Sequence, residues 1–202
     1  MEHPLLADLD PSQRAAVTHE SPTLAILAPA GSGKTRVLTR RVAWLVEERR
    51  VAAAHVLAVT FTRKAAGELA QRLGRLGVRQ VTAGTFHSLA LAQLRRHSVE
   101  HGREPPAVLG AKGRIIGPIV GGRGPGARVA VMEIAAEIEW AKARLVGPGE
   151  YTAAVLAAGR LTPRAAPEIA SIYERYEQEK RKRHLVDFDD LLRWCALTIE
   201  RD

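Results

Sequence analysis

Cysteine and aromatic residues are scarce in this chain. A single thiol, Cys195, excludes a disulfide framework and a Cys/His metal site, and its apolar context LLRWCALTI predicts burial. Aromatic residues make up 4% of the 202 residues, so we expect a core of Ala, Leu, Val and Ile. No apolar run approaches transmembrane length, and residues 1–13 lack the apolar stretch of a signal peptide. We therefore expect a soluble, cytoplasmic protein without a membrane partner.

Acidic residues are fewer than basic residues in this chain. The formal net charge is +8 and the pI is about 10.2. Such a basic excess favours a polyanionic partner, nucleic acid first. A genome that biases its codons towards Arg and Ala would produce the same composition. Charge alone leaves both interpretations open.

The most informative stretch runs through residues 24–39. Residues 24–28 are apolar and predict a short buried strand, and Lys34 and Thr35 open an amphipathic helix. The tight turn between them consists of Pro29, Ala30, Gly31, Ser32 and Gly33. Strand, glycine-rich turn and helix with Gly-Lys-Thr at the junction is the P-loop arrangement.

The chemistry of phosphate binding explains these residue types. Backbone N–H groups must curl around an anionic phosphate, and a Cβ at Gly31 or Gly33 would obstruct that curl. Lys34 would reach the β- and γ-phosphates, and the Thr35 hydroxyl would bind Mg²⁺. Ala28 stands where the pattern usually has its first glycine, so a chance strand–turn–helix is the alternative.

Two more apolar strands are predicted after this helix, at residues 56–61 and 81–86, and each is followed by a helix. Before the P-loop, Asp10 and Gln13 have the spacing of a capping box that starts a helix ending near residue 19. The alternation predicts an α/β fold with a parallel sheet and right-handed crossovers. The P-loop, Thr60 and Thr85 should then lie along one edge of the sheet, where ligands bind.

The pattern changes after about residue 97. The segment GGRGPG at residues 121–126 is interpreted as a flexible loop, and beyond it we expect only helices, including two with apolar spacing over 131–138 and 169–176. The second of these ends in a basic run at 180–183, either a solvated helix end or a nucleic-acid-binding face. Asp187 is expected to cap the last helix.

Five blocks, taken in order, resemble the N-terminal portion of UvrD/Rep/PcrA-type superfamily 1 DNA helicases. They are LDPSQRAAV, APAGSGKTRVLTRRVAWLV, LAVTFTRKAAGELAQRL, VTAGTFHSLALAQLRRH and HLVDFDDLL. The resemblance implies a RecA-like P-loop NTPase, an α/β fold whose parallel sheet is incomplete here, with an all-helical inserted domain. Residues 1–97 would form the first part, 98–195 the insertion, and 196–202 the truncated return to the RecA-like domain.

The resemblance also implies residue roles. Gln13 would read the adenine edge, in competition with its capping box, and Arg36 would lie beside the base. ATP and Mg²⁺ would be held by Ala28, Pro29, Ala30, Gly31, Ser32, Gly33, Lys34 and Thr35, with Lys34 and Thr35 catalytic. Single-stranded DNA would be contacted by Thr60, Phe61, Thr62, Lys64, Thr85, Phe86, His87 and Ser88. Core packing is the alternative for the two phenylalanines, and a structural role at a helix start is the alternative for His87.

Hydrolysis needs an acid on Mg²⁺, which the family supplies in an apolar strand ending Asp-Glu-x-x-Asp. The nearest acidic cluster here, Asp187, Asp189 and Asp190, follows KRKRHLV, which we interpret as unable to form a buried strand. We therefore expect the N-terminal part of an ATP-dependent DNA helicase. The intact protein would move along DNA in the 3′–5′ direction, and this chain alone would be inactive. Its partners would be single-stranded DNA, DNA junctions and repair or recombination proteins. A non-hydrolysing nucleotide- or DNA-binding module is the alternative.

Overall fold

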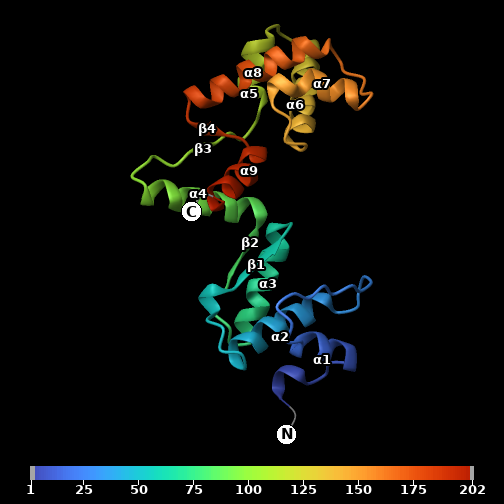
Figure 1. Ribbon diagram of the computed structural model, residues 1–202, viewed down its shortest axis with the longest axis vertical. Coiled ribbons are helices and arrows are strands. Elements are labelled where there is room, and N and C mark those ends of the chain that lie inside the picture. The colour runs from blue at the N-terminus through green and yellow to red at the C-terminus, as the bar shows by residue number, and fades with distance from the viewer. Residues whose placement is uncertain (1–2, 201–202) are drawn as a thin grey trace. The chain divides into compact units, whose positions relative to one another are not determined.

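The computed structural model describes residues 3–200 and is helix-rich, with two small parallel sheets (Figure 1). Its contacts divide the chain into two compact units, Met1–Leu89 and Ala90–Asp202. Residues 1–2 and 201–202, at the outer ends of the first and last predicted segments, lie outside the described part. Among the described helices, none is long and apolar enough to cross a membrane.

The first unit contains two of the three predicted strands, each followed by a helix. Its elements are η1 (Pro4–Leu6), α1 (Pro11–Thr18), α2 (Lys34–Glu47), η2 (Ala53–His55), β1 (Leu57–Thr60), α3 (Arg63–Arg75), β2 (Thr82–Thr85) and the start of α4 (Phe86–Glu100). Strands β1 and β2 pair in parallel, and Thr60 lies opposite Thr85. The predicted strands at 56–61 and 81–86 are therefore confirmed, each shorter by one residue at either end.

Local capping chemistry starts these helices where the sequence predicts. The Asp10 carboxylate accepts from the Gln13 N–H at 2.8 Å, and the Gln13 side chain accepts from the Asp10 N–H at 3.3 Å. The capping box of α1 is thus confirmed. Thr62 caps α3 by accepting from the Ala65 N–H at 3.1 Å.

The core of the first unit lies between the sheet and its helices. Val42 and Ala43 of α2 pack with Ala58 of β1 and with Leu69 and Leu73 of α3. A second cluster joins α1, together with Leu9 before it, to α2, and its buried side chains are Leu9, Val17 and Val37. Helix α2 therefore contributes buried residues to both clusters.

The strand predicted at residues 24–28 is not formed. These residues have no regular structure, and the Leu27 side chain is 96% exposed. A strand requires a neighbour that completes its hydrogen-bond ladder. Within the described residues, β1 and β2 pair with each other and no strand pairs with this segment. The apolar composition was interpreted correctly, but the prediction of a strand was wrong here.

The second unit is mainly helical, as predicted. It holds α5 (Gly113–Val120), α6 (Pro125–Lys142), η3 (Pro148–Glu150), α7 (Tyr151–Ala157), α8 (Ala166–Lys182) and α9 (Phe188–Ile199), together with β3 (Ala107–Val108) and β4 (Leu185–Val186). The main cluster includes all three tyrosines of the chain, Tyr151, Tyr173 and Tyr176. This core is therefore more aromatic than the composition predicted, because the few aromatic residues are concentrated in it.

Two details of this unit correct the sequence analysis. Strands β3 and β4 pair in parallel, and Val186 is fully buried, so the segment after the basic run does form a short buried strand. The expectation of helices alone beyond residue 126 was wrong for this reason. The last two residues of GGRGPG, Pro125 and Gly126, already belong to α6, where proline suits the first helical position.

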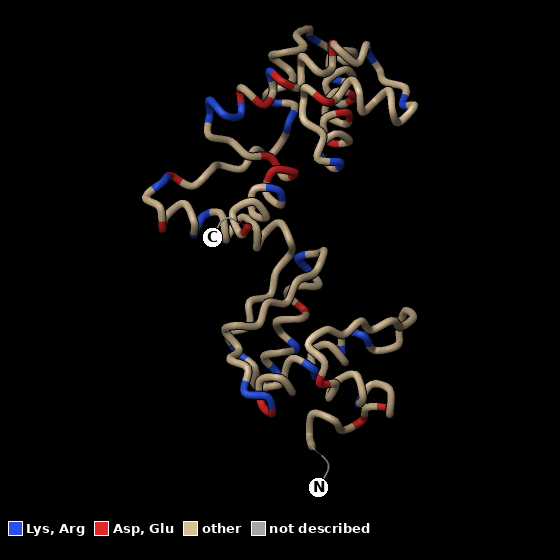
Figure 2. The backbone as a smooth tube through the Cα atoms, viewed as in Figure 1, with Lys and Arg blue, Asp and Glu red and all other residues tan. Residues whose placement is uncertain are grey.

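Lys and Arg occur in both units and are interspersed with Asp and Glu (Figure 2). The basic run at the end of α8 is not one surface. The side chains of Arg181, Lys182 and Arg183 are 63%, 69% and 54% exposed, whereas that of Lys180 is 2% exposed. Lys180 is therefore unavailable to a nucleic-acid partner, and the other three residues form the exposed helix end.

Candidate functional site

The glycine-rich loop, defined as residues 28–33, leads directly into α2. Gly31 and Gly33 have φ values of 78° and 80°, a left-handed conformation that favours glycine. A Cβ at Gly33 would also lie 3.2 Å from the Gln13 Nε2 atom, whereas Gly31 has open space around it. The loop thus combines a tight turn with a free surface at Gly31 on which a ligand can approach the backbone.

Lys34 begins α2 and turns back over this loop. Its Nζ donates to the carbonyl oxygens of Ala28 at 2.7 Å and Pro29 at 2.5 Å, and the Ser32 hydroxyl also donates to Pro29 at 2.8 Å. The lysine is exposed, so an anion can reach its ammonium group. Thr35, the second residue of α2, is exposed as well. Free N–H groups of the helix start add a positive dipole end at this position.

Gln13 connects α1 to the loop. Its Nε2 donates to the Ser32 carbonyl at 3.2 Å while its Oε1 completes the capping box, so one amide serves both contacts. Beside it is a cavity of about 410 Å³, lined among others by Ser12, Ile26 and Lys34. Asp10 is the one carboxylate among the described lining residues, and it is engaged as the cap of α1.

Arg36 has a buried Nη2 atom with no hydrogen-bond partner among the described residues. An unpaired buried guanidinium donor is costly, so such a donor usually marks a position where a ligand or water completes the bonding. The arginine lies on the first turn of α2, two residues after Lys34. Its free donor is compatible with a nucleotide bound next to the loop.

The carboxyl ends of β1 and β2 form a second group. The rings of Phe61 and Phe86 have centroids 5.6 Å apart and are inclined at 46°. Phe61 is 89% exposed and Phe86 is 47% exposed, so neither is a core residue in this structure. An exposed aromatic pair at a sheet edge is an arrangement on which nucleic-acid bases stack.

Polar groups surround this pair. The Thr85 N–H donates to the Ser88 hydroxyl at 2.9 Å, and the Ser88 N–H donates to the Thr85 hydroxyl at 3.2 Å, which organises the start of α4. Lys64 is exposed in the first turn of α3, and His87 is half-buried. The predicted DNA-contacting residues thus lie at the ends of two paired strands, and the hydroxyls of Thr62, Thr85 and Ser88 also cap helices.

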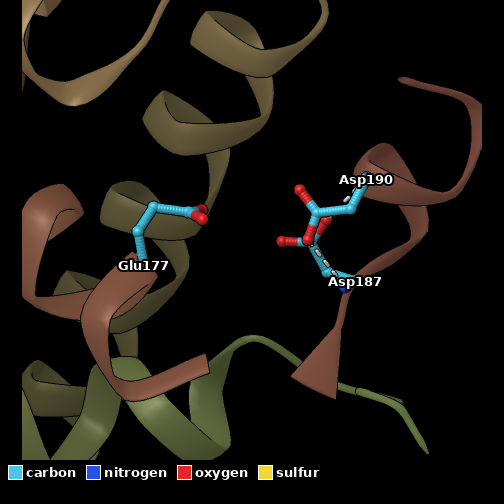
Figure 3. Close-up of side chains that lie close together, drawn as sticks. All are labelled: Glu177, Asp187 and Asp190. Atoms are coloured by element: carbon cyan, nitrogen blue, oxygen red, sulfur yellow. Dashed lines mark hydrogen bonds between the residues drawn. The ribbon is translucent and has the colours of Figure 1, made fainter. Parts of the chain in front are cut away.

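The acidic cluster near the C-terminus has a different environment. Glu177 of α8 and Asp187 and Asp190 of the β4–α9 junction direct their carboxylates towards one another (Figure 3). Two ammonium groups lie among them. Lys142 Nζ is 2.7 Å from Asp187 and 2.6 Å from Asp190, and Lys180 Nζ contacts Asp187 at 3.0 Å and also Asp190.

Mutual neutralisation stabilises these charges. Burial alone would raise the pKa of Asp187, but Lys142 and Lys180 hold that pKa well below its usual range. Burial alone would lower the pKa of Lys142, but Asp187, Asp190 and Glu177 raise it. Burial and the nearby Asp187 also raise the pKa of the Tyr176 hydroxyl, which donates to Asp187 at 2.7 Å. The cluster is a buried ion network, and the lysines occupy the positions a cation would take.

Lys142, Lys180 and Glu177 were not predicted from the sequence as members of this network. The apolar spacing of α8 does continue to Lys180, four residues after Tyr176, and that of α6 continues to Lys142, four residues after Ile138. These spacings were the available signal for the two lysines. The third acid of the cluster, Asp189, lies outside the network and pairs with Lys112 at 2.9 Å.

Fold and site together define a class: an α/β protein with a parallel strand pair and a glycine-rich loop at a helix start. Residues 9–202 match the family model described as the UvrD/REP helicase N-terminal domain. The chain belongs to this family.

Several curated relatives are named as DNA helicases. The chain is 43% identical to ATP-dependent DNA helicase UvrD2 of Mycobacterium tuberculosis (strain ATCC 25618 / H37Rv), over 98% of this chain and 30% of that protein. It is 35% identical to UvrD1 of the same strain, over 93% of this chain and 25% of that protein. It is 46% identical to DNA helicase II of Escherichia coli (strain K12), over 48% of this chain and 14% of that protein. The chain therefore spans about a third or less of these relatives.

Proposed function

We propose that this chain is the N-terminal ATP- and single-stranded-DNA-binding part of an ATP-dependent DNA helicase. The observation that carries the proposal is the glycine-rich loop at the start of α2, with Lys34 over it and Gln13 beside it, in a member of the UvrD/REP family. Residues 1–97 would form the first part of a RecA-like domain, 98–195 an inserted helical domain, and 196–202 the return to the RecA-like domain.

The nucleotide would occupy the loop and the adjoining cavity. Its phosphates would replace the two carbonyl oxygens that Lys34 now contacts, because a charge-assisted bond to phosphate is stronger than one to a neutral carbonyl. Mg²⁺, when bound, would neutralise phosphate charge, and the Thr35 hydroxyl would hold it. Arg36 would gain a partner for its buried donor, and the Gln13 amide would meet the base.

Single-stranded DNA would bind at the carboxyl ends of β1 and β2. Phe61 and Phe86 would stack on bases, and Lys64 with the nearby hydroxyls and His87 would hold phosphates. In the intact protein, ATP turnover would drive movement along DNA in the 3′–5′ direction, at junctions and with repair or recombination proteins as partners. This polarity and these partners follow from the family resemblance.

We also propose that the chain alone binds ATP without hydrolysing it. Asp187 and Asp190 are buried and paired with Lys142 and Lys180, so they are not free to hold Mg²⁺. Asp10, which lines the cavity, is committed to the cap of α1. As an isolated unit, the chain would then behave as a nucleotide- and DNA-binding module, whereas the longer relatives are named ATP-dependent helicases.

The test is titration with a fluorescent ATP analogue and Mg²⁺, comparing the wild-type chain with Lys34→Ala. Lys182→Ala serves as the matched control, because Lys182 is an exposed lysine of the second unit. We expect Lys34→Ala to abolish measurable binding and Lys182→Ala to leave it unchanged. Equal binding by all three proteins would refute the nucleotide site.

Hydrolysis is measured with the same proteins in the presence of oligo-dT. We expect no turnover by the wild-type chain. Turnover that disappears in Lys34→Ala would contradict the non-hydrolysing proposal and would require a carboxylate in this chain to complete the site. Binding of labelled oligo-dT, compared between wild type and Phe61→Ala, tests the DNA site, and we expect it to weaken.

A further inference from the structure

Helix α2 carries two consecutive arginines that hold the segments preceding it. Each uses its Nη1 atom to donate to three main-chain carbonyl oxygens. For Arg40 these acceptors are Pro4 at 3.4 Å, Leu5 at 2.8 Å and Ala7 at 2.6 Å. For Arg41 they are Ala16 at 2.9 Å, Val17 at 3.3 Å and His19 at 2.9 Å.

The carbonyls that Arg41 contacts are those at the end of α1. The last carbonyls of a helix have no partner within the helix and form the negative end of its dipole. No glycine in the left-handed conformation ends α1, because its C-cap is His19 with φ −55° and ψ 132°. The guanidinium of Arg41 therefore takes the part of a C-terminal cap, supplied from a neighbouring helix.

Helix α1 depends on such contacts for its position. It has eight residues, too few for a helix to be stable in water by itself. Its fully buried residue is Val17, which packs against α2 through Val37. Apolar packing resists separation of the two helices but is non-directional, whereas the fan of bonds from Arg41 fixes where α1 ends.

The other end of α1 carries Gln13, whose amide lies 3.2 Å from the Ser32 carbonyl. The glycine-rich loop containing Ser32 leads into the same helix that carries Arg41. Lys34 and Arg41 are seven residues apart in α2 and so share one face of it. Helix α2 thus holds the loop at its own start and holds α1 through Arg41. These two attachments together set the distance between Gln13 and the loop.

We infer that Arg41 is a positioning residue that holds α1 so that Gln13 stays beside the glycine-rich loop, and that it thereby sets affinity and base selectivity for an adenine nucleotide. This inference rests on the proposed function. Lysine would replace Arg41 incompletely, because its ammonium is a compact charge on a flexible stem without the planar donor geometry of guanidinium.

The experiment measures dissociation constants for fluorescent analogues of ATP and GTP with the full chain. Arg41→Met is compared with Arg40→Met, a matched control that loses the same kind of triple carbonyl contact but from residues 4–7, which include no predicted ligand-binding residue. We expect Arg41→Met to weaken ATP-analogue binding by about tenfold and to reduce the preference for adenine as much as Gln13→Ala does. Arg40→Met should change binding by less than about threefold.

Two further variants separate positioning from general damage. Arg41→Lys should recover part of the lost selectivity, and it remains informative if Arg41→Met does not fold, as judged by far-UV circular dichroism. The double variant Gln13→Ala/Arg41→Met should lose little more selectivity than Gln13→Ala, since both changes act on one interaction.

Three results would overturn the inference: wild-type selectivity in Arg41→Met and Arg41→Lys, equal losses in Arg40→Met and Arg41→Met, or additive losses in the double variant. Each of these leaves the proposed function intact as long as Lys34→Ala still abolishes binding. Failure of Lys34→Ala to weaken binding would instead refute the proposed nucleotide site itself. The two failures are therefore distinguishable within one set of titrations.

Discussion

Replacing Lys180 by methionine tests whether the buried ion network stabilises the second unit. The Lys180 side chain is 2% exposed, and its Nζ lies 3.0 Å from both Glu177 and Asp187 and also contacts Asp190. Methionine has a similar length and flexibility, so the apolar part of the packing is retained while the charge is lost. The substitution therefore isolates the electrostatic contribution.

The expected cost follows from the charges that remain. Three carboxylates would be left with Lys142 as their one ammonium partner in the network. Removing one member of a buried ion pair typically costs about 3–5 kcal/mol, because the remaining charge is desolvated and uncompensated. Since Lys142 still reaches all three carboxylates, we expect the lower end, about 3 kcal/mol. For a unit of this size that corresponds to a fall in Tm of about 10 °C or more.

The assay is urea unfolding followed by tryptophan fluorescence in a Trp44→Phe background. Trp44 lies in the first unit, so its removal leaves Trp140 and Trp194 as reporters of the second unit. Lys182→Met is the matched control. Its side chain is 69% exposed and pairs with Glu179 at the surface, where such pairs contribute about 1 kcal/mol or less.

An unfolding midpoint for Lys180→Met equal to that of Lys182→Met would refute the reasoning, because it would mean that the network contributes nothing beyond a surface pair. A higher midpoint would refute it as well. That outcome would show that the free energy of desolvating the buried charges exceeds the free energy gained from their attraction.

The remaining predictions concern pH and close packing. Because the pKa of Asp187 is lowered, its ion pairs should stabilise the second unit above about pH 4 and be lost as the pH falls further. Because the pKa of Lys142 is raised, its contribution to the stability of the second unit should persist to about pH 10 and fall above it. Urea midpoints between pH 2 and 11 should thus be highest in the middle of the range, and a flat profile would contradict the prediction. Gly84→Ala should destabilise the first unit by about 1–3 kcal/mol, because the new Cβ would lie 2.9 Å from the Leu89 Cγ atom. Gly67→Ala, in open space on α3, is its control and should be neutral or stabilising. Both are measured by urea unfolding in a Trp140→Phe/Trp194→Phe background, where Trp44 reports the first unit.

Features governed by nearby residues could be predicted from the sequence. Asp10 and Gln13 form the expected capping box, and Asp187 caps the helix that it was expected to cap. Each of these contacts spans three residues, so the sequence contains both partners of each contact in one short window. The parallel pairing of β1 with β2 followed from the strand–helix–strand pattern, whose connections have a restricted topology.

Features that need a distant partner could not be predicted in the same way. Residues 24–28 are apolar enough for a strand, but the pattern of one segment does not reveal whether a neighbour pairs with it. The pairing of β3 with β4 joins segments more than 70 residues apart through two-residue strands, too short to show a period. Lys180 was interpreted as part of an exposed basic run and Lys142 was given no role, although helical spacing places both on buried faces.

The two groups of charged residues differ in what they can bind. In the second unit, Lys142 and Lys180 are buried and already paired with carboxylates, so displacing them would expose uncompensated charge. In the first unit, Lys34 is exposed and its partners are two neutral carbonyl oxygens, which an incoming phosphate can replace with a gain in electrostatic energy. The exposed charge of Lys34 therefore favours the glycine-rich loop as the binding site. The charges of the buried ion network are more numerous but already paired, which favours a structural role for the network.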